Sequence, residues 1–395
     1  MKEISCPKLI SKMAIKNINR KESIKKKLIM FLQDWLYVKK MFGIIFYISF
    51  FIIVFLFSTI GTKYYEEDKI KGKIFIFISF IILLLLIGLR YNVGTDYESY
   101  LRVYKIIRIT PWNQLNNINM ELGCKVLFKL ISTFSKNDYI IFIFTGFLTI
   151  YPIYKLNKVL NYKYLPYSIL TFCMLFLPFC LNGIRQGIAL SFLCLSFTYL
   201  YKKEYKKTII SFVTGFLFHK SSLLFLPYEI LYIIIKEKKY RKYSIMITII
   251  ISIAILFFFK DLMNVDELEK YTYLLKKISV ENISLNSLFF YTPILIITLI
   301  YKQKTTVYNI LQSLFIDGII LHIVGTSAQF FYRISLYFTT YQIILIPYII
   351  QNIKTKNSRI TIKMIYIIYL IIYFVYFSYI CGKHEIFPYD TWITK

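Results

Sequence analysis

The sequence contains few acidic residues and few of the side chains that bind metals. Asp and Glu together number 21 against 49 Lys and Arg, and only three histidines occur in 395 residues. Because the histidines are scattered and no tight carboxylate cluster occurs, the sequence argues against a zinc enzyme. The six cysteines form no CxxC pair, so we interpret them as core residues, with a disulfide between Cys124 and Cys381 as the open alternative.

No internal repeat is detectable, and long apolar runs dominate the chain instead. Apolar residues make up 57% and aromatic residues 19% of the sequence. Such runs predict transmembrane helices, so we expect an all-α, polytopic helical integral membrane protein with about twelve spans. The spans are predicted near 41–60, 74–89, 138–154, 164–180, 184–201, 207–218, 221–235, 243–259, 287–301, 307–328, 333–350 and 362–380. The pair at 207–235 is short, which favours broken or re-entrant helices.

The net charge of +28 would suit a nucleic-acid-binding protein, but the positions of the basic residues argue against that class. Nearly half of the 49 Lys and Arg lie in six short loops between spans, as the positive-inside rule requires of cytoplasmic loops. These loops are 61–73, 155–163, 202–207, 236–242, 302–306 and 351–363. We therefore expect the segments at the other ends of the spans to lie outside the cell membrane, or in the periplasm.

Residues 1–40 disagree with this orientation. They carry 11 Lys and Arg, yet strict alternation of the spans would place them outside, where a basic tail is disfavoured. Two explanations stay open. The true start is Met41 and residues 1–40 are an upstream extension, or the basic tail lies on the inner leaflet as an interfacial helix. In either case we expect residues 41–395 to form a single polytopic domain.

The first predicted external segment combines a basic residue with two acidic ones. Arg90 ends the second span, and a turn leads into a helix that carries Asp96, Glu98 and two aromatic residues, Tyr97 and Tyr100. One interpretation is structural: Thr95 and Glu98 have capping-box spacing, and Arg90 reaches the membrane interface. The other is functional: Asp96 or Glu98 is a general base, and Arg90 binds a substrate phosphate.

A second external motif begins the predicted span at 184–201. Its helix start exposes free backbone N–H groups and the positive end of the helix dipole, where a further cation is disfavoured. Arg185 therefore needs an anionic partner. A bound diphosphate, a lipid phosphate and a protein carboxylate are the alternatives. Asn182 and Gln186 flank this arginine, and Gly183 and Gly187 would permit tight helix packing.

Two more helix starts on the same side carry basic residues, His219 and Arg333. His219 is either an interfacial packing residue or a group that binds phosphate or moves a proton. Independent interfacial anchoring would use Lys as often as Arg or His, whereas Arg favours bidentate phosphate recognition. The C-terminal tail, which contains His384, Glu385, Tyr389 and Asp390, is either a solvated terminus or a cover over the external cleft. Glu229, Asp317 and His322 lie within spans and are weaker candidates.

Five segments in this order resemble the EpsG family of Wzy-type exopolysaccharide and O-antigen polymerases. They read RYNVGTDYESY, NGIRQGIALSF, FHKSSLLFLP, YRISLYF and PYD, and they begin at residues 90, 182, 218, 332 and 388. The resemblance runs from about residue 41 to the end of the chain. Each motif is short, and their combination on one predicted face is more specific than any one of them.

The resemblance implies a glycosyltransferase that moves a growing glycan from undecaprenyl diphosphate onto another lipid-linked repeat unit, at the outer face of the cytoplasmic membrane. On this basis we predict catalytic roles for Asp96, Arg185 and His219. Substrate binding is predicted for Arg90, Tyr97, Glu98, Tyr100, Asn182, Gln186, Arg333 and Tyr389. The implied partners are the undecaprenyl-diphosphate-linked oligosaccharide, a flippase, a chain-length regulator and an initiating transferase.

We expect no cofactor and no resident metal, apart from a divalent cation carried by the substrate diphosphate. Two other functions stay open. A GT-C type glycosyltransferase with a prenyl-monophosphate donor would use Asp96 and Glu98 as its acidic pair. A flippase or transporter would suit the number of spans, although transporters commonly have repeats and polar sites at the membrane midplane.

Overall fold

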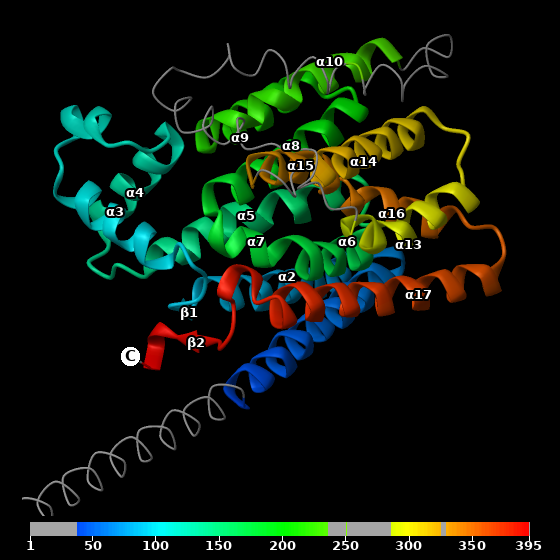
Figure 1. Cartoon of the computed structure of the whole chain (residues 1–395), viewed down its shortest axis with the longest axis horizontal. Helices are drawn as coiled ribbons and strands as arrows, with labels where there is room; N and C mark the ends of the chain where they lie inside the picture. Colours follow the sequence, from blue (N-terminus) through cyan, green and yellow to red (C-terminus); the bar gives the residue numbers. More distant parts are fainter. Residues whose placement is uncertain (1–37, 236–249, 251–285, 325–328, 395) are drawn as a thin grey trace, which may run out of the picture.

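The computed structural model describes residues 38–235, 250, 286–324 and 329–394, and these form a helical protein (Figure 1). The described residues contain one sheet, in which β1 (Arg90–Tyr91) pairs antiparallel with β2 (Asp390–Thr391). This pair joins the segment after the second helix to the end of the chain. The expectation of an all-α integral membrane protein is confirmed in its class.

Seven of the described helices are long and apolar enough to cross a membrane. They are Val38–Glu67, Lys69–Gly88, Ile140–Val159, Leu165–Asn182, Thr306–Ile323, Phe331–Asn352 and Lys356–Ile380. Shorter helices occupy further predicted spans: α8 (Ile184–Tyr201), α9 (Tyr205–Phe218), α10 (Leu226–Ile235) and α13 (Asn286–Ile300). The span predicted at 243–259 lies outside the described residues, so the number of about twelve spans stays a prediction.

Several predicted spans are interrupted. The span predicted at 164–180 consists of α6 (Leu165–Thr171), a π-helical turn η2 (Phe172–Phe176) and α7 (Leu177–Asn182). The one predicted at 333–350 is divided into α15 (Gln329–Thr339) and α16 (Gln342–Asn352). At the short pair, α9 ends at Phe218, and a 3-10 turn η3 (Lys220–Phe225) leads into α10. This break sets His219 between two helices.

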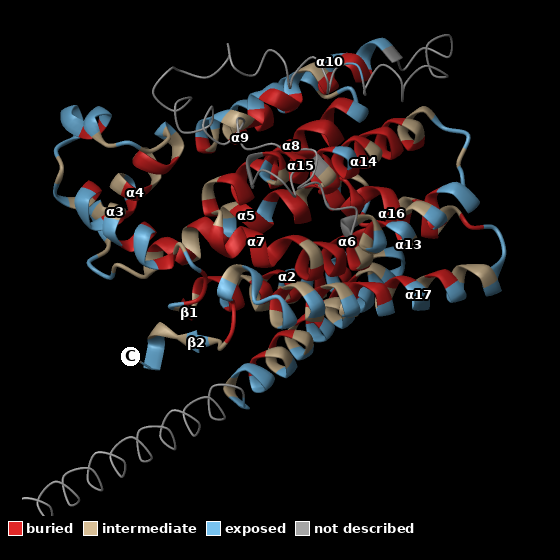
Figure 2. Ribbon diagram, in the orientation of Figure 1, coloured by how far each residue is buried: buried red, intermediate tan, exposed pale blue. Residues whose placement is uncertain are grey.

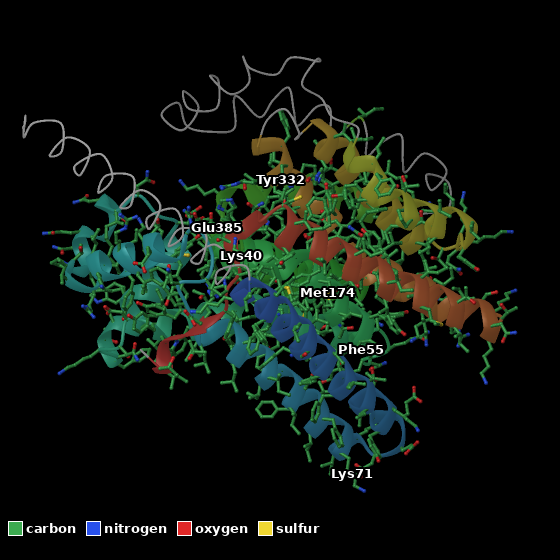
Figure 3. The ribbon with its side chains drawn as sticks, turned by 60° about the horizontal axis from the view of Figure 1, so that its bottom comes forward. Lys40, Phe55, Lys71, Met174, Tyr332 and Glu385 are labelled. Atoms are coloured by element: carbon green, nitrogen blue, oxygen red, sulfur yellow. The ribbon has the colours of Figure 1, made fainter. Side chains whose placement is uncertain are left out.

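The first helix, Val38–Glu67, and α2 (Lys69–Gly88) run side by side in opposite directions (Figure 1). The Asp68 carboxylate accepts hydrogen bonds from the backbone N–H groups of Ile70 and Lys71, which fixes the turn between them. Figure 3 shows Lys40 and Lys71 at opposite ends of this pair. The Lys40 end lies with the C-terminal segment, because the Phe46 and Tyr389 rings stack with centroids 4.6 Å apart.

The helices differ in how far they are buried, which separates an inner from an outer layer (Figure 2). In the apolar stretches of Leu165–Asn182 and Phe331–Asn352, 89% of the residues are buried. In those of Val38–Glu67 and Lys356–Ile380, 28% are buried. The inner helices are therefore enclosed by protein, while the outer ones present apolar side chains to the surroundings. α14 (Thr306–Val324) and α5 (Ile140–Val159) are intermediate.

A small helical unit is attached beside the spans at the Arg90 end (Figure 1). This α3–α4 unit consists of α3 (Tyr97–Ile109), the 3-10 helix η1 (Trp112–Asn117) and α4 (Leu122–Phe134). Its core contains Tyr104 and Phe128, and it continues into Phe142 of α5 and Ile188 of α8 without interruption. Shared burial of apolar side chains therefore fixes the unit to the spans.

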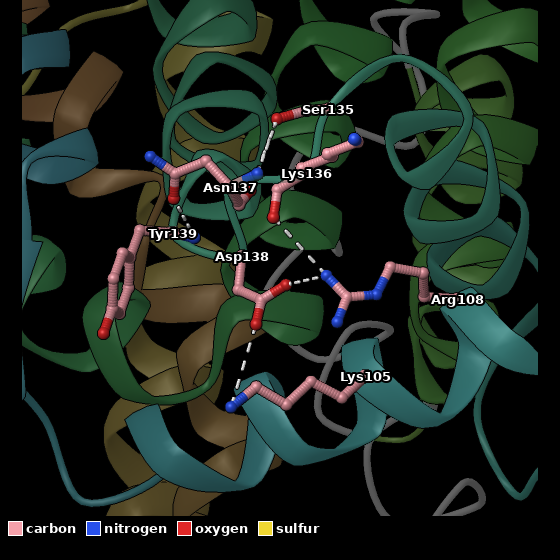
Figure 4. A network of polar contacts seen from close by, with 7 residues as sticks. All are labelled: Lys105, Arg108, Ser135, Lys136, Asn137, Asp138 and Tyr139. Atoms are coloured by element: carbon pink, nitrogen blue, oxygen red, sulfur yellow. Dashed lines mark hydrogen bonds and ion pairs between the residues drawn. The ribbon is translucent and has the colours of Figure 1, made fainter.

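Ion pairs strengthen the attachment of the α3–α4 unit to α5. Asp138 pairs with Arg108, and Lys105 Nζ lies 3.7 Å from Asp138 Oδ2 (Figure 4). The neighbouring Asn137 carboxamide oxygen accepts a hydrogen bond from the Tyr139 N–H at 2.9 Å, just before α5 begins at Ile140. The ion pairs thus tie α3 to the chain segment that joins α4 to α5.

Candidate active site

Glu121 joins the two basic residues that the sequence placed at separate helix starts. One carboxylate oxygen, Oε1, lies 2.8 Å from Nδ1 of His219, and the other, Oε2, pairs with Nη1 of Arg185. The Glu121 side chain is 11% exposed, that of His219 22% and that of Arg185 34%. The carboxylate is therefore largely withdrawn from solvent, while both of its partners keep an exposed edge.

Local sequence explains how the three side chains meet. Glu121 occupies the N-cap position of α4, and its side chain makes no hydrogen bond to its own helix, so both carboxylate oxygens are free for other partners. Gly123, in the first turn of α4, lies against the end of α9: a Cβ atom there would be 2.8 Å from the carbonyl oxygen of Leu217. This contact between backbones brings Glu121 to His219, which follows α9 directly.

Arg185 is positioned by a tight hairpin between α7 and α8. Gly187 faces α7, and a Cβ atom on it would lie 2.9 Å from the Cβ of Cys180. The packing role that the sequence allowed for this glycine is therefore the one it has in the structure. Arg185 lies in the first turn of α8, and a protein carboxylate, that of Glu121, supplies the anionic partner it requires.

The charge state of the cluster follows from its contacts. Burial by itself raises the pKa of Glu121, but the hydrogen bond from His219 and the charge of Arg185 outweigh it and lower the pKa to about 2. An ionised carboxylate only accepts hydrogen bonds. Nδ1 of His219 therefore carries the hydrogen and donates the hydrogen bond to Glu121. The other ring nitrogen of a neutral His219 is then an unprotonated base.

Further polar side chains surround the cluster. Tyr100 of α3 contacts Arg185, and its burial raises the pKa of its phenol although the arginine charge opposes this. Ser221 Oγ and the Tyr337 hydroxyl lie 3.0 Å apart next to His219. Nε of Arg185 is buried and has no hydrogen-bond partner among the described residues. A base, an anchored cation and spare donors therefore lie within one small region, an arrangement suited to moving a proton beside an anionic group.

The model of the EpsG family matches residues 73–391.

The chain belongs to the EpsG family.

This membership indicates a polysaccharide polymerase-like membrane protein with, at a general level, a glycosyltransferase-like role. No curated protein and no solved structure matches the chain. In this EpsG chain the matched region includes the α3–α4 unit, the Glu121 cluster and β2.

The predicted catalytic residues of this EpsG chain fall into two groups. Arg185 and His219 are brought together, through Glu121. Asp96 is the N-cap residue of α3, and its carboxylate forms no hydrogen bond or ion pair within the described part of the chain. Glu98 is exposed on the first turn of the same helix. The structure therefore gives the stronger acid–base setting to His219, and the catalytic roles of Asp96, Arg185 and His219 all stay predictions.

The capping box expected at Thr95 and Glu98 is not formed, and this interpretation was wrong. The N-cap of α3 is Asp96, and no side chain caps the helix. The Thr95 hydroxyl instead donates to Oδ1 of Asn182 at 3.2 Å. A tertiary contact with the end of α7 thus replaces the local one.

Two predicted substrate-binding residues of the EpsG chain, Arg90 and Tyr97, are buried, and a third, Tyr389, is partly buried. Arg90 is 1% exposed, donates to the carbonyl oxygens of Ile87 and Leu181, and has its guanidinium 4.6 Å from the Phe142 ring centroid. Tyr97 is fully buried and stacks on the same ring at 4.2 Å. The Tyr389 hydroxyl donates to the carbonyl oxygen of Leu86. These contacts join α2, α5, α7 and the C-terminal segment.

The remaining predicted residues lie on α3, α7, α8 and α15, and two of them make contacts between distant segments. The Asn182 amide donates to the carbonyl oxygen of His384 at 2.9 Å, and the Gln186 amide donates to that of Arg333 at 2.7 Å. The Arg333 side chain is exposed, whereas Tyr100 is 7% exposed. Of this set, Arg333 has the accessibility that binding a large substrate requires.

The sequence did not single out Glu121. It is one of three acidic residues in the external segment 90–137, with Asp96 and Glu98, and its partners follow 64 and 98 residues later. The unmet charge of Arg185 was the only signal, because it required a carboxylate or a ligand. No group of three potential metal ligands occurs within the described residues, and Cys124 and Cys381 are free thiols, so the alternative of a disulfide between them is wrong.

Proposed function

We propose that this EpsG-family protein is a polysaccharide polymerase that transfers a growing glycan from undecaprenyl diphosphate onto the terminal sugar of another lipid-linked repeat unit. The reaction takes place at the outer face of the cytoplasmic membrane. The observation that carries the proposal is the carboxylate of Glu121 shared between His219 and Arg185. The family match supports the polymerase class, and the cluster supplies chemistry that suits this transfer.

His219 is the base in this reaction. Its unprotonated ring nitrogen removes the proton from the accepting sugar hydroxyl as the oxygen attacks the anomeric carbon of the donor. Glu121 holds the tautomer in which Nδ1 is protonated and stabilises the imidazolium that forms, as the carboxylate does in a Ser-His-Asp triad. The new glycosidic bond forms between the acceptor oxygen and the anomeric carbon.

The leaving group is the lipid diphosphate. The bond between the anomeric carbon and a diphosphate oxygen breaks, and negative charge develops on that oxygen. Arg185 holds Glu121 through one nitrogen and has further N–H groups, which face the region of bond breaking in our proposal. Because the donor is already activated as a diphosphate, the reaction needs no nucleotide sugar. A flippase, a chain-length regulator and an initiating transferase would act with it.

Glycan length in a deletion strain tests this function. The strain is complemented with wild type, His219→Asn or Asp96→Asn, and glycans are separated by gel while lipid-linked repeat units are assayed on each side of the membrane. Single repeats with units accumulating outside, rescued by wild type and not by His219→Asn, are expected. Units trapped inside would identify a flippase, and truncated units would identify a sugar-adding transferase.

A further inference from the structure

A second basic cluster lies beside the Glu121 site, where the C-terminal segment crosses the start of α15. Lys383 Nζ lies 5.5 Å from the ring centroid of Tyr332, the neighbour of Arg333, and 4.7 Å from that of Phe377. The adjacent His384 packs its ring against Phe179, with centroids 5.8 Å apart. Three basic side chains from two distant parts of the sequence thus share one place.

This cluster has no compensating acid within the described residues. Neither Arg333 nor Lys383 forms an ion pair there, although Glu385 follows directly in the chain. Burial of the His384 ring, together with the charges of Lys383 and Arg333, lowers the pKa of His384 to about 4. Arg185, by contrast, is already paired with Glu121. Arg333 and Lys383 are therefore neighbouring basic groups without an acidic partner among the described residues, and a multivalent anion would supply one.

The backbone that carries Lys383 and His384 is held in a strained conformation. His384 and Glu385 have φ angles of 74° and 46°, in the left-handed region that side chains disfavour. Two hydrogen bonds hold this backbone in place. The Asn182 amide donates to the carbonyl oxygen of His384 at 2.9 Å, and the Gly94 N–H donates to that of Glu385 at 3.1 Å. The backbone from which the two basic side chains project is thus held in place before any ligand binds.

An apolar surface leads away from this cluster. The helix that precedes Lys383, α17 (Lys356–Phe374) with its π-helical end η6 (Val375–Ile380), exposes Ile380 at 66%, Ile372 at 57% and Ile368 at 55%. The basic cluster therefore follows directly after the end of a helix whose exposed side chains are apolar, as contact with lipid requires. A ligand with an anionic head and a long hydrocarbon tail matches both parts.

We propose that Arg333, Lys383 and His384 bind the diphosphate of the donor's prenyl carrier, with the prenyl chain lying against the exposed face of α17. This rests on the proposed function, in which Arg185 faces the oxygen of the breaking bond, and assigns the rest of the diphosphate to a site separate from Glu121 and His219. The start of α8 links the two sites, because Arg185 contacts Glu121 while the next residue, Gln186, binds the Arg333 carbonyl. Successive helix residues point about 100° apart, so the base and the diphosphate lie on different sides of the first turn of α8.

Binding of farnesyl diphosphate to the purified full-length protein, measured by native mass spectrometry, tests this site. We expect Arg333→Gln and Lys383→Gln each to weaken binding by about tenfold or more, and Lys383→Arg to retain it. Lys136→Gln removes an exposed lysine elsewhere on the same predicted face and should bind as wild type does. Unchanged affinity in both glutamine variants would overturn the proposal.

Two other probes identify the ligand class. Inorganic pyrophosphate should bind more weakly than farnesyl diphosphate, and equal binding would remove the α17 face from the site. Phosphatidylglycerol should not displace farnesyl diphosphate at equal concentration, and displacement would make this a general anionic-lipid site and overturn the assignment.

Glu121→Gln separates this site from the proposed function. It should bind farnesyl diphosphate within about twofold of wild type while losing polymerisation, since Glu121 contacts His219 and Arg185 and neither Arg333 nor Lys383. If Glu121→Gln made polymer of normal length, the proposed function would be wrong. If it lost polymer, but Arg333→Gln and Lys383→Gln bound farnesyl diphosphate as tightly as wild type, only the proposed diphosphate site would be wrong.

Discussion

Gly123 and Leu217 approach so closely that a Cβ atom on the glycine would lie 2.8 Å from the leucine carbonyl oxygen. The contact joins the first turn of α4 to the last turn of α9, and both members of the Glu121–His219 pair lie within two residues of it. Because backbone cannot rotate away as a side chain can, relief of a clash here would require one helix to move.

Gly123→Ala should therefore lower polymerisation strongly by separating Glu121 from His219, at a stability cost of about 1–3 kcal/mol. Glycan length in the complemented deletion strain and thermal unfolding of the purified protein measure the two effects. Leu122→Ala is the matched control, because Leu122 is 53% exposed and in the same turn. If Gly123→Ala gave polymer of normal length, close contact between α4 and α9 would not be needed for activity.

Glu121→Gln should reduce the polymerisation rate by about 10²–10⁴-fold, because a neutral amide no longer orients and stabilises the imidazole charge. Asp96→Asn should have a much smaller effect, since Asp96 has no partner through its carboxylate within the described residues. Initial rates with a purified lipid-linked repeat unit make the comparison. The opposite ranking of the two variants would transfer the role of base from His219 to Asp96.

Arg185→Ala should abolish polymerisation while leaving the amount of membrane-inserted protein near normal. Arg185→Lys should also fail, because lysine cannot keep the contact with Glu121 and present further planar donors at the same time. Immunoblots of membrane fractions and glycan gels measure the two quantities together. Activity in the lysine variant would mean that charge alone is sufficient at this position.

The stability of the cluster should depend on pH through Glu121. Its pKa falls from an ordinary value of 4.5 to about 2 on folding, so the folded state favours the ionised form. That contribution is complete above about pH 4.5 and is lost as the pH falls from there toward 2. Thermal unfolding of wild type and Glu121→Gln should therefore converge at low pH. Curves that stay parallel between pH 6 and pH 3 would contradict a lowered pKa.

The helical class and the position of the basic residues could be predicted from local pattern, since apolar runs and helix starts are properties of neighbouring residues. The need of Arg185 for an anion was equally local. Its partner was not, because Glu121 is brought to it by the packing of α4 against α9. The spacing of residues in the sequence does not indicate which acidic residue of the external segments this packing brings to Arg185.

For Arg90 and Thr95, the local sequence pattern indicated a role that contacts with distant segments replaced. A terminal arginine beside a predicted turn suggested a phosphate ligand, yet the end of α7 and Phe142 enclose it. Thr95 had the spacing of a cap, but Asn182 offers it a partner from 87 residues away. In both cases a contact between segments outweighed the local pattern.

The pairing of β1 with β2 sets an order of events during synthesis. Arg90 and Asn182 are made early, whereas His384, which accepts a hydrogen bond from Asn182, follows it by 202 residues. Membrane insertion of most of the described helices therefore precedes completion of this junction. A nascent chain halted before residue 384 would have these helices in place and still lack the contacts that bring Lys383 and His384 to Arg333, so the site forms only after residue 384 has been made.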